Sequence, residues 1–174
     1  MYKKILVPLD GSKQSEGVLP LISMLAKSNQ AEIVLLRVVE YPYTLYSNVY
    51  EDSALDPDLM KKIQDEKDSI YSEVEGYLEK VMAKLVSTGV EVTIEVCEGP
   101  IVESIFESTN RLQADLIALA MCSQSKCTRC IMGSIASRVL HESPVTVIMV
   151  RHQAIIPGAI LEHYTPLQDR QTFA

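Results

Sequence analysis

The stretch KKILVPLDGS at residues 3–12 decides the fold of this chain. Its apolar part runs without alternation over residues 5–9 and ends in an aspartate, a glycine and a serine. A continuous apolar run is typical of a strand that is buried on both faces, so the stretch predicts a parallel sheet. Polar residues directly after such a strand lie at the carboxyl edge of the sheet, where parallel sheets bind their ligands.

Four further segments of the chain have the character of strands. They cover residues 31–39 (AEIVLLRVV), 91–97 (EVTIEVC), 115–121 (DLIALAM) and 144–150 (PVTVIMV). Residues 31–39 and 115–121 are almost continuously apolar, as buried parallel strands are. Residues 91–97 alternate between apolar and polar positions instead, which predicts a less buried strand at an edge of the sheet.

Apolar residues at helical spacing predict a helix after each of the first four strands. The first helix follows residues 10–12, whose aspartate or serine is placed to cap it, and Pro20 marks either its first turns or a kink. The others are predicted over residues 58–87, 100–112 and 133–141. This alternation predicts an α/β fold, an open and doubly wound sheet of five parallel strands with helices on both faces.

The composition is that of a single domain and disfavours several classes of function. A length of 174 residues with 47% hydrophobic residues supports one core covered on two sides. A net charge of −7 and a pI near 5.0 disfavour binding to nucleic acid or to an anionic membrane, since both need clustered Lys and Arg. No apolar run approaches the roughly 18 residues of a membrane span or has the form of a signal peptide, so we expect a cytoplasmic protein.

Two groups at the expected carboxyl edge point to a ligand site. Gly133 and Ser134 open the last predicted helix, where a glycine allows close approach of a ligand and a serine can donate to a phosphate oxygen. Asp10 directly follows the first strand and could accept from a ribose hydroxyl or an adenine amine. An ordinary helix cap and an ordinary turn would use the same residues, so the pattern leaves both interpretations open.

Four stretches taken together resemble the universal stress proteins. They are KKILVPLDGS, AEIVLLRVVE, DLIALA and MGSIASRVLHESPVTVIMVR, and the likeness spans residues 1–151. The resemblance implies a Rossmann-like fold of the adenine nucleotide alpha hydrolase type, with strand order 3-2-1-4-5, and leaves residues 152–174 as a C-terminal extension. It also implies a stress-response or signalling protein that binds ATP or AMP and forms a homodimer through residues 144–150.

Nucleotide-binding members of that family carry a motif of glycine, two residues, glycine, nine residues, then glycine and serine or threonine. The matching positions here are Ala120, Ser123, Gly133 and Ser134, so only the last part of the motif is intact. A serine in place of glycine costs about 1 kcal/mol or more where the backbone needs a positive φ. Gln124 stands where binding members often carry a basic residue. These departures favour a second hypothesis, an interaction module that binds no nucleotide.

The resemblance assigns roles to individual residues. It implies an adenine and ribose pocket at Pro8, Leu9, Asp10 and Val38, and it implies that Ala120, Ser123, Gly133, Ser134 and Ile135 surround the phosphates of ATP bound with Mg or Mn. No triad spacing or other catalytic constellation accompanies these residues. Slow ATP hydrolysis is therefore the most activity that we expect, and we assign no catalytic residue.

The cysteines support a third hypothesis, a thiol or metal sensor. Cys122, Cys127 and Cys130 have the spacing C-x4-C-x2-C, which resembles part of an iron–sulfur pattern. The implied strand order places Cys97 about 14 Å from Cys122, too far for one cluster unless the loop folds across. Three thiolates could still hold zinc with His141 or water. Basic residues in the same predicted loop could instead lower the pKa of a thiol. Four cysteines in such a chain do not indicate a disulfide framework.

Overall fold

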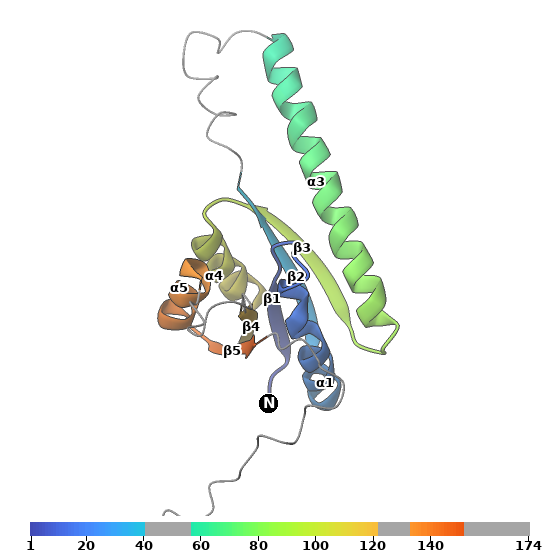
Figure 1. The fold of residues 1–174 in the computed structure, drawn as a ribbon, viewed down its shortest axis with the longest axis vertical. Helices are drawn as coiled ribbons and strands as arrows, with labels where there is room; N and C mark the ends of the chain where they lie inside the picture. Colours follow the sequence, from blue (N-terminus) through green and yellow to red (C-terminus); the bar gives the residue numbers. More distant parts are fainter. Residues whose placement is uncertain (41–56, 122–132, 152–174) are drawn as a thin grey trace, which may run out of the picture.

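The strands of this protein form one parallel sheet with the order β3-β2-β1-β4-β5 (Figure 1). The computed structural model describes residues 1–40, 57–121 and 133–151. Within these ranges the strands are β1 (Lys4–Pro8), β2 (Glu32–Val39), β3 (Val92–Glu98), β4 (Leu116–Met121) and β5 (Thr146–Arg151). The predicted α/β class, the parallel sheet and the strand order are confirmed. β3 lies at one edge of the sheet and is only partly buried, as its alternating sequence predicted.

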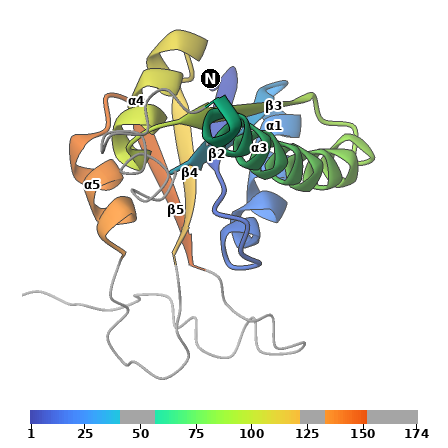
Figure 2. The same cartoon turned by 90° about the horizontal axis from the view of Figure 1, so that it is seen from above.

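Helices cover both faces of the sheet, so the domain has three layers (Figure 2). The helical elements are η1 (Ser15–Val18), α1 (Leu19–Asn29), α3 (Pro57–Val86), α4 (Ile101–Leu112) and α5 (Ser134–Glu142). Buried residues of α1 and α3 pack on one face of the sheet, and those of α4 and α5 pack on the other. The doubly wound arrangement predicted from the sequence is therefore confirmed.

The middle strand explains why the apolar run at the start of the chain is continuous. Ile5 and Val7 face α1 and α3, whereas Leu6 faces α4 and α5, and all three side chains are fully buried. Successive side chains of a strand point to opposite faces, so a strand covered on both sides needs an apolar residue at every position.

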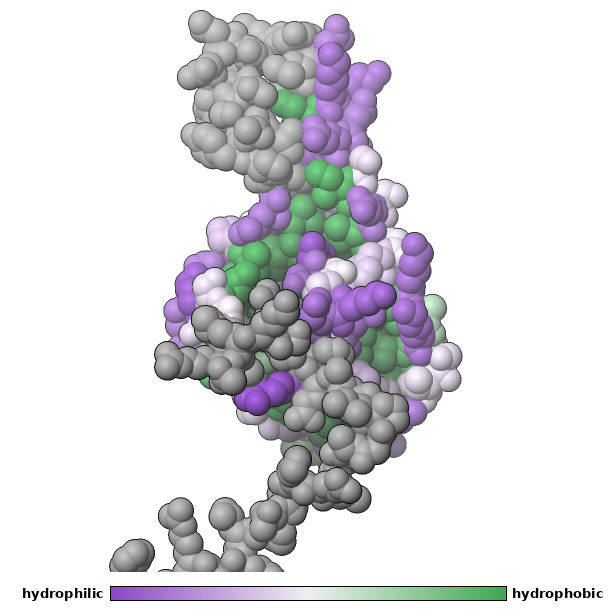
Figure 3. All heavy atoms as spheres, in the orientation of Figure 1, coloured by the Kyte–Doolittle hydropathy of each residue, from purple (hydrophilic) through white to green (hydrophobic). Residues whose placement is uncertain are grey.

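The helix α3 is much longer than the strands beside it. It has 30 residues, which at 1.5 Å per residue is about 45 Å, and Figure 1 shows its first half extending beyond the sheet. Its second half is anchored by three buried residues, Leu78, Val81 and Leu85. Figure 3 shows hydrophilic residues along its outer side. No helix in the described ranges, α3 included, is long and apolar enough to cross a membrane.

The structure corrects one expectation about the first helix and decides between the two alternatives for Pro20. Neither Asp10 nor Ser12 caps α1, because the short helix η1 comes between them, and the N-cap of α1 is Val18 without a side-chain hydrogen bond. The Ser12 hydroxyl instead accepts a hydrogen bond from the Ser15 N–H at 3.1 Å, at the start of η1. Pro20 lies in the first turn of α1, where its missing N–H is not needed, so it marks a start and no kink.

Candidate functional site

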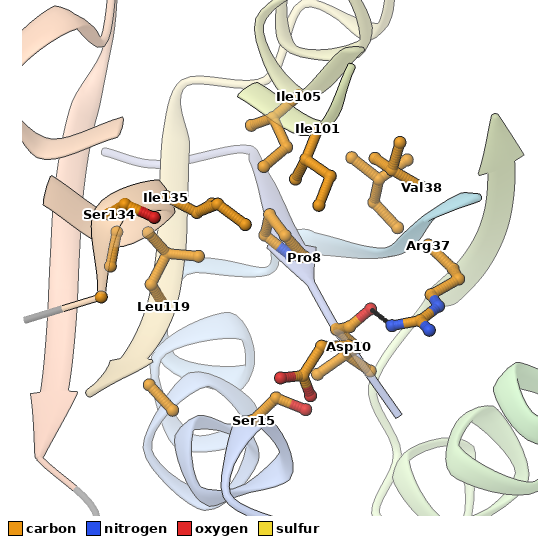
Figure 4. A pocket seen from close by; sticks show the side chains of 15 residues that line it. Pro8, Asp10, Ser15, Arg37, Val38, Ile101, Ile105, Leu119, Ser134 and Ile135 are labelled. Carbon is orange, nitrogen blue, oxygen red and sulfur yellow. Dashed lines mark hydrogen bonds between the residues drawn. The ribbon is translucent and has the colours of Figure 1, made fainter. Parts of the chain in front are cut away.

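A cavity of about 290 Å³ opens at the carboxyl edge of the sheet (Figure 4). Its walls come from the ends of β1, β2 and β4 and from the first turns of α4 and α5. Strand order reverses between β1 and β4, which is where open parallel sheets bind ligands. The volume lies just below the roughly 300–1,000 Å³ that is usual for small-molecule sites.

The structure brings almost all of the predicted site residues together. The residues that line the cavity include Pro8, Leu9, Asp10, Val38, Ala120, Gly133, Ser134 and Ile135. They come from parts of the chain that are far apart in sequence and meet only because β1 lies between β2 and β4. Ser123 and Gln124 lie outside the described residues.

One end of the cavity is formed by the start of α5. Gly133 is the N-cap, and no side chain of the described residues caps the helix here. The first intrahelical bond runs from the Ser137 N–H to the Gly133 carbonyl at 2.9 Å. The N–H groups at the beginning of a helix have no acceptor within the helix. Together with the helix dipole, these amides suit an anionic group.

The backbone conformation at the N-cap of α5 does not require a glycine. Gly133 has a φ of −59°, which any residue adopts, and a Cβ added to it would meet no atom of the described residues within 4 Å. The sequence-based suggestion that Ser134 caps the helix is wrong, because Ser134 is the first residue inside it. An added side chain at Gly133 would therefore affect what enters the cavity more than it would affect the fold.

A carboxylate marks a second part of the cavity. Oδ1 of Asp10 accepts a hydrogen bond from the Ser12 N–H at 2.8 Å, across Gly11, whose φ of +84° suits glycine. Partial burial acts to raise the pKa of Asp10, but hydrogen bonds from Ser12 and Ser15 and the charge of Arg37 outweigh it and hold the pKa below its usual value. Asp10 is thus an ionised acceptor at neutral pH.

Arg37 also lines the cavity, although it is not among the site residues predicted from the sequence. Its Nη1 donates a hydrogen bond to the Leu9 carbonyl at 3.1 Å (Figure 4). A basic residue near the carboxyl end of an otherwise apolar strand is the sequence feature that indicates it. Burying a guanidinium is costly unless it is paired, so an arginine at such a position indicates a specific partner.

Apolar side chains form the remainder of the cavity. Val38, Ile101 and Ile105 lie on one side of Pro8, while Asp10 and Ser15 lie on the other (Figure 4). The α4 residues were not predicted as part of a site, because only the strand order brings the start of α4 next to β1 and β2. The cavity therefore combines an apolar lobe, a carboxylate and a helix N-terminus, which is a combination suited to an amphiphilic ligand with an anionic end.

The metal hypothesis gains no support from the part of the chain that the structure describes. That part holds no group of three or more residues able to ligate a metal, and Cys122, Cys127 and Cys130 lie outside it. The Cys97 thiol is half-buried, and burial, aided by the charge of Glu107, raises its pKa. A protonated thiol is a poor metal ligand and a poor nucleophile.

The known proteins to which this chain is similar belong to a single family. The model of the universal stress protein family matches residues 1–151. Universal stress protein MJ0531 of Methanocaldococcus jannaschii is 27% identical over 151 residues, which is 87% of this chain and 83% of that protein. The solved structure of the hypothetical protein MJ0577 aligns with a TM-score of 0.68 at 21% identity, over 88% of this chain and 99% of that one.

Two other structures with this fold contain an adenine nucleotide. A universal stress protein in complex with cAMP aligns with a TM-score of 0.55 at 16% identity, over 87% of this chain and 98% of that one. A universal stress protein family protein from Arabidopsis thaliana with AMP bound aligns with a TM-score of 0.59 at 16% identity, over 87% of this chain and 93% of that one. At these identities the likeness concerns the fold.

Proposed function

This chain belongs to the universal stress protein family, and from that premise we propose that it binds an adenine nucleotide, ATP or AMP, in the cavity at the carboxyl edge of its sheet. One observation carries the proposal. A single cavity joins an apolar lobe, an ionised carboxylate and the uncapped start of α5. The proteins of the same fold that hold cAMP and AMP support the choice of ligand class.

The proposed pose follows the chemistry of the cavity from one end to the other. The adenine ring lies in the apolar lobe at Val38 and Ile101, because a flat aromatic ring gains most from apolar contact. The phosphates lie at the start of α5, where amide N–H groups and the helix dipole favour negative charge. Asp10 then lies beside the sugar between them. Ala120 narrows the site by no more than a methyl group.

We propose further that residues 1–151 are the functional unit and that it acts as a homodimeric signalling or stress-response protein, with the two copies paired along β5. β5 is an edge strand of the sheet, and its inner positions are half-buried apolar residues. An apolar edge of this kind tends to pair or to be covered. Sedimentation analysis tests this part, and a mass of 19.4 kDa at all concentrations would contradict it.

Calorimetric titration of the purified protein with ATP and magnesium tests nucleotide binding. We expect the wild type to bind and Asp10→Ala to bind about tenfold more weakly, because a hydrogen bond to a charged group contributes about 1.5–3 kcal/mol. Asp68→Ala is the matched control, since it removes the same charge from an exposed position on α3 that does not line the cavity. We expect it to bind as the wild type does.

If the wild type shows no binding heat at millimolar ATP, nucleotide binding is refuted and the hypothesis of an interaction module is favoured instead. Equal binding by wild type and Asp10→Ala would leave the function standing and remove Asp10 from the site.

A further inference from the structure

Arg37 occupies an unusual position in the sheet. It lies in β2 between Leu36 and Val38, which are both buried, and it is itself only partly exposed. A charge in such a place is costly unless it is paired or hydrogen-bonded. Among the described residues, its Nη1 donates a hydrogen bond to the Leu9 carbonyl, and its charge acts on nearby Asp10. Arg37 is therefore compensated by groups at the end of β1.

The hydrogen bond lies where pairing between β1 and β2 ends. The register of the two strands closes at Pro8 and Leu36, and one further backbone bond joins the Leu9 N–H to the Leu36 carbonyl at 2.8 Å. The Leu9 carbonyl then receives the guanidinium instead of a strand partner. Leu9 is thus held by β2 through both its N–H and its carbonyl.

The next residue along the chain is Asp10, and its carboxylate is only partly occupied. Oδ1 accepts the Ser12 N–H and the Ser12 and Ser15 side chains also bond to the carboxylate, but an ionised carboxylate offers about four acceptor positions. Glu16 and Tyr77 lie on the neighbouring elements, with the Tyr77 hydroxyl donating to Glu16 Oε1 at 3.3 Å. Despite partial burial, hydrogen bonds from the two serines and, to a smaller extent, the positive charge of Arg37 hold the pKa of Asp10 below its usual value.

The position of Asp10 within the cavity determines which part of a bound nucleotide it can contact. In Figure 4, Val38, Ile101 and Ile105 lie beyond Pro8 from Asp10, and Ser134 lies at the opposite end of the view from Arg37. A base in the apolar lobe and phosphates at α5 leave the sugar nearest to Asp10. The two hydroxyls of a ribose are donors, and an ionised carboxylate is their natural acceptor.

We propose that Arg37 is a positioning residue, which fixes the Leu9 carbonyl at the end of β1 and so holds the Asp10 carboxylate toward the ribose hydroxyls of a bound nucleotide. The proposal rests on the nucleotide function proposed above and deepens it. It makes the site selective for the sugar, with Arg37 acting through Asp10 and not by touching the ligand.

Competition between ATP and 2′,3′-dideoxy-ATP tests the proposal, because the second ligand lacks both hydroxyl donors. We expect the wild type to prefer ATP by about tenfold or more, from hydrogen bonds to a charged acceptor. Arg37→Met keeps the length of the side chain but removes its donors, and we expect the preference to fall to about twofold or less. The ratio of ATP to AMP affinity, which reports the phosphate end, should stay unchanged.

Two further variants keep the experiment decisive. Arg37→Lys keeps the charge and so protects the fold, but a single ammonium cannot reproduce the planar geometry of a guanidinium, so we expect the sugar preference to fall here as well. Arg111→Met is the control, since it also removes an arginine, one that pairs with Glu95 away from the cavity. It should retain the full preference.

The outcomes separate the two proposals. If Arg37→Met weakens ATP and dideoxy-ATP equally, Arg37 has only a structural role and the positioning proposal is overturned. If the wild type binds both ligands equally, Asp10 does not contact the ribose and the proposal is overturned while nucleotide binding stands. If the wild type binds neither ligand, the proposed function itself fails.

Discussion

The two edges of the sheet contain similar side chains but use them differently. At the amino edge, Lys4 Nζ lies 3.0 Å from Glu32 Oε2, and the Thr93 hydroxyl donates to Glu32 Oε1 at 2.7 Å. Asp115 accepts from the Lys3 N–H at 2.8 Å. At the carboxyl edge, by contrast, the carboxylate of Asp10 lies beside a cavity.

The difference teaches how to separate structural from functional polar groups in this fold. The amino edge is closed by polar groups that satisfy one another across neighbouring strands. The carboxyl edge carries an uncapped helix start and two glycines with positive φ, Gly11 and Gly99, in the loops that follow β1 and β3. Substitutions at the amino edge should therefore change stability alone, whereas the carboxyl edge can change binding and stability independently.

The largest effect is expected from Gly133→Asp at the carboxyl edge. An aspartate is a good N-cap and interacts favourably with the helix dipole, so thermal unfolding should be unchanged or slightly later. The same carboxylate would repel the phosphates by up to about 4 kcal/mol at 4 Å, so ATP affinity measured by calorimetry should fall about a hundredfold or more. If Gly133→Asp lost both thermal stability and ATP affinity, binding and stability would not be independent at the carboxyl edge.

Ser72→Asp is the matched control for that prediction. It adds the same charge at an exposed position of α3 that does not line the cavity. Its ATP affinity should stay within about twofold of the wild type, since salt screens exposed charges over about 8–10 Å.

A smaller effect, on stability alone, is expected from Gly99→Ala. Gly99 has a φ of +127°, and an added Cβ would lie 3.0 Å from the Ser104 hydroxyl oxygen, so the variant should lose about 1–3 kcal/mol in chemical denaturation. In Gly76→Ala the added Cβ in α3 meets no atom of the described residues within 4 Å, so the free energy of unfolding should rise by about 0.5–1 kcal/mol. If both variants gained stability, or both lost it, the backbone strain assigned to Gly99 would be contradicted.

The smallest effect is expected from Glu32→Gln at the amino edge, and it depends on pH. Burial acts to raise the pKa of Glu32, but Thr93 and Lys4 outweigh it, so the folded-state pKa is below 4.5. The contribution of the ionised carboxylate, about 0.2–1 kcal/mol for a pair this exposed, is present above pH 4.5 and is lost as pH falls through the folded-state pKa.

Denaturation curves of wild type and Glu32→Gln at pH 7 and at a descending series of acidic pH values measure this contribution. Wild type should be the more stable protein at pH 7, and the difference should shrink as the pH falls through the lowered pKa of Glu32. A change in ATP affinity would show that the amino edge is coupled to the site.

Much of the fold could be predicted because β1, β2 and β4 are buried on both faces, which imposes a continuous apolar sequence on each. The candidate site was predicted in part, since Asp10 and Gly133 directly follow or precede a recognisable element. Arg37 was missed because its partner is a carbonyl just past the end of another strand. Which carbonyl it reaches depends on the register between β1 and β2, and that register has no local sequence signal.

The sequence by itself determined the alternation of strands and helices, the family, and the polar residues that stand at strand ends and helix starts, because these depend on local patterns of burial and turn formation. Only the tertiary structure decided which of those residues meet. The crossovers set β1 between β2 and β4, and this order alone brings Asp10, Val38 and Ser134 around one cavity. Contacts between distant parts of the chain depend on strand order and register, which are properties of the whole packed sheet.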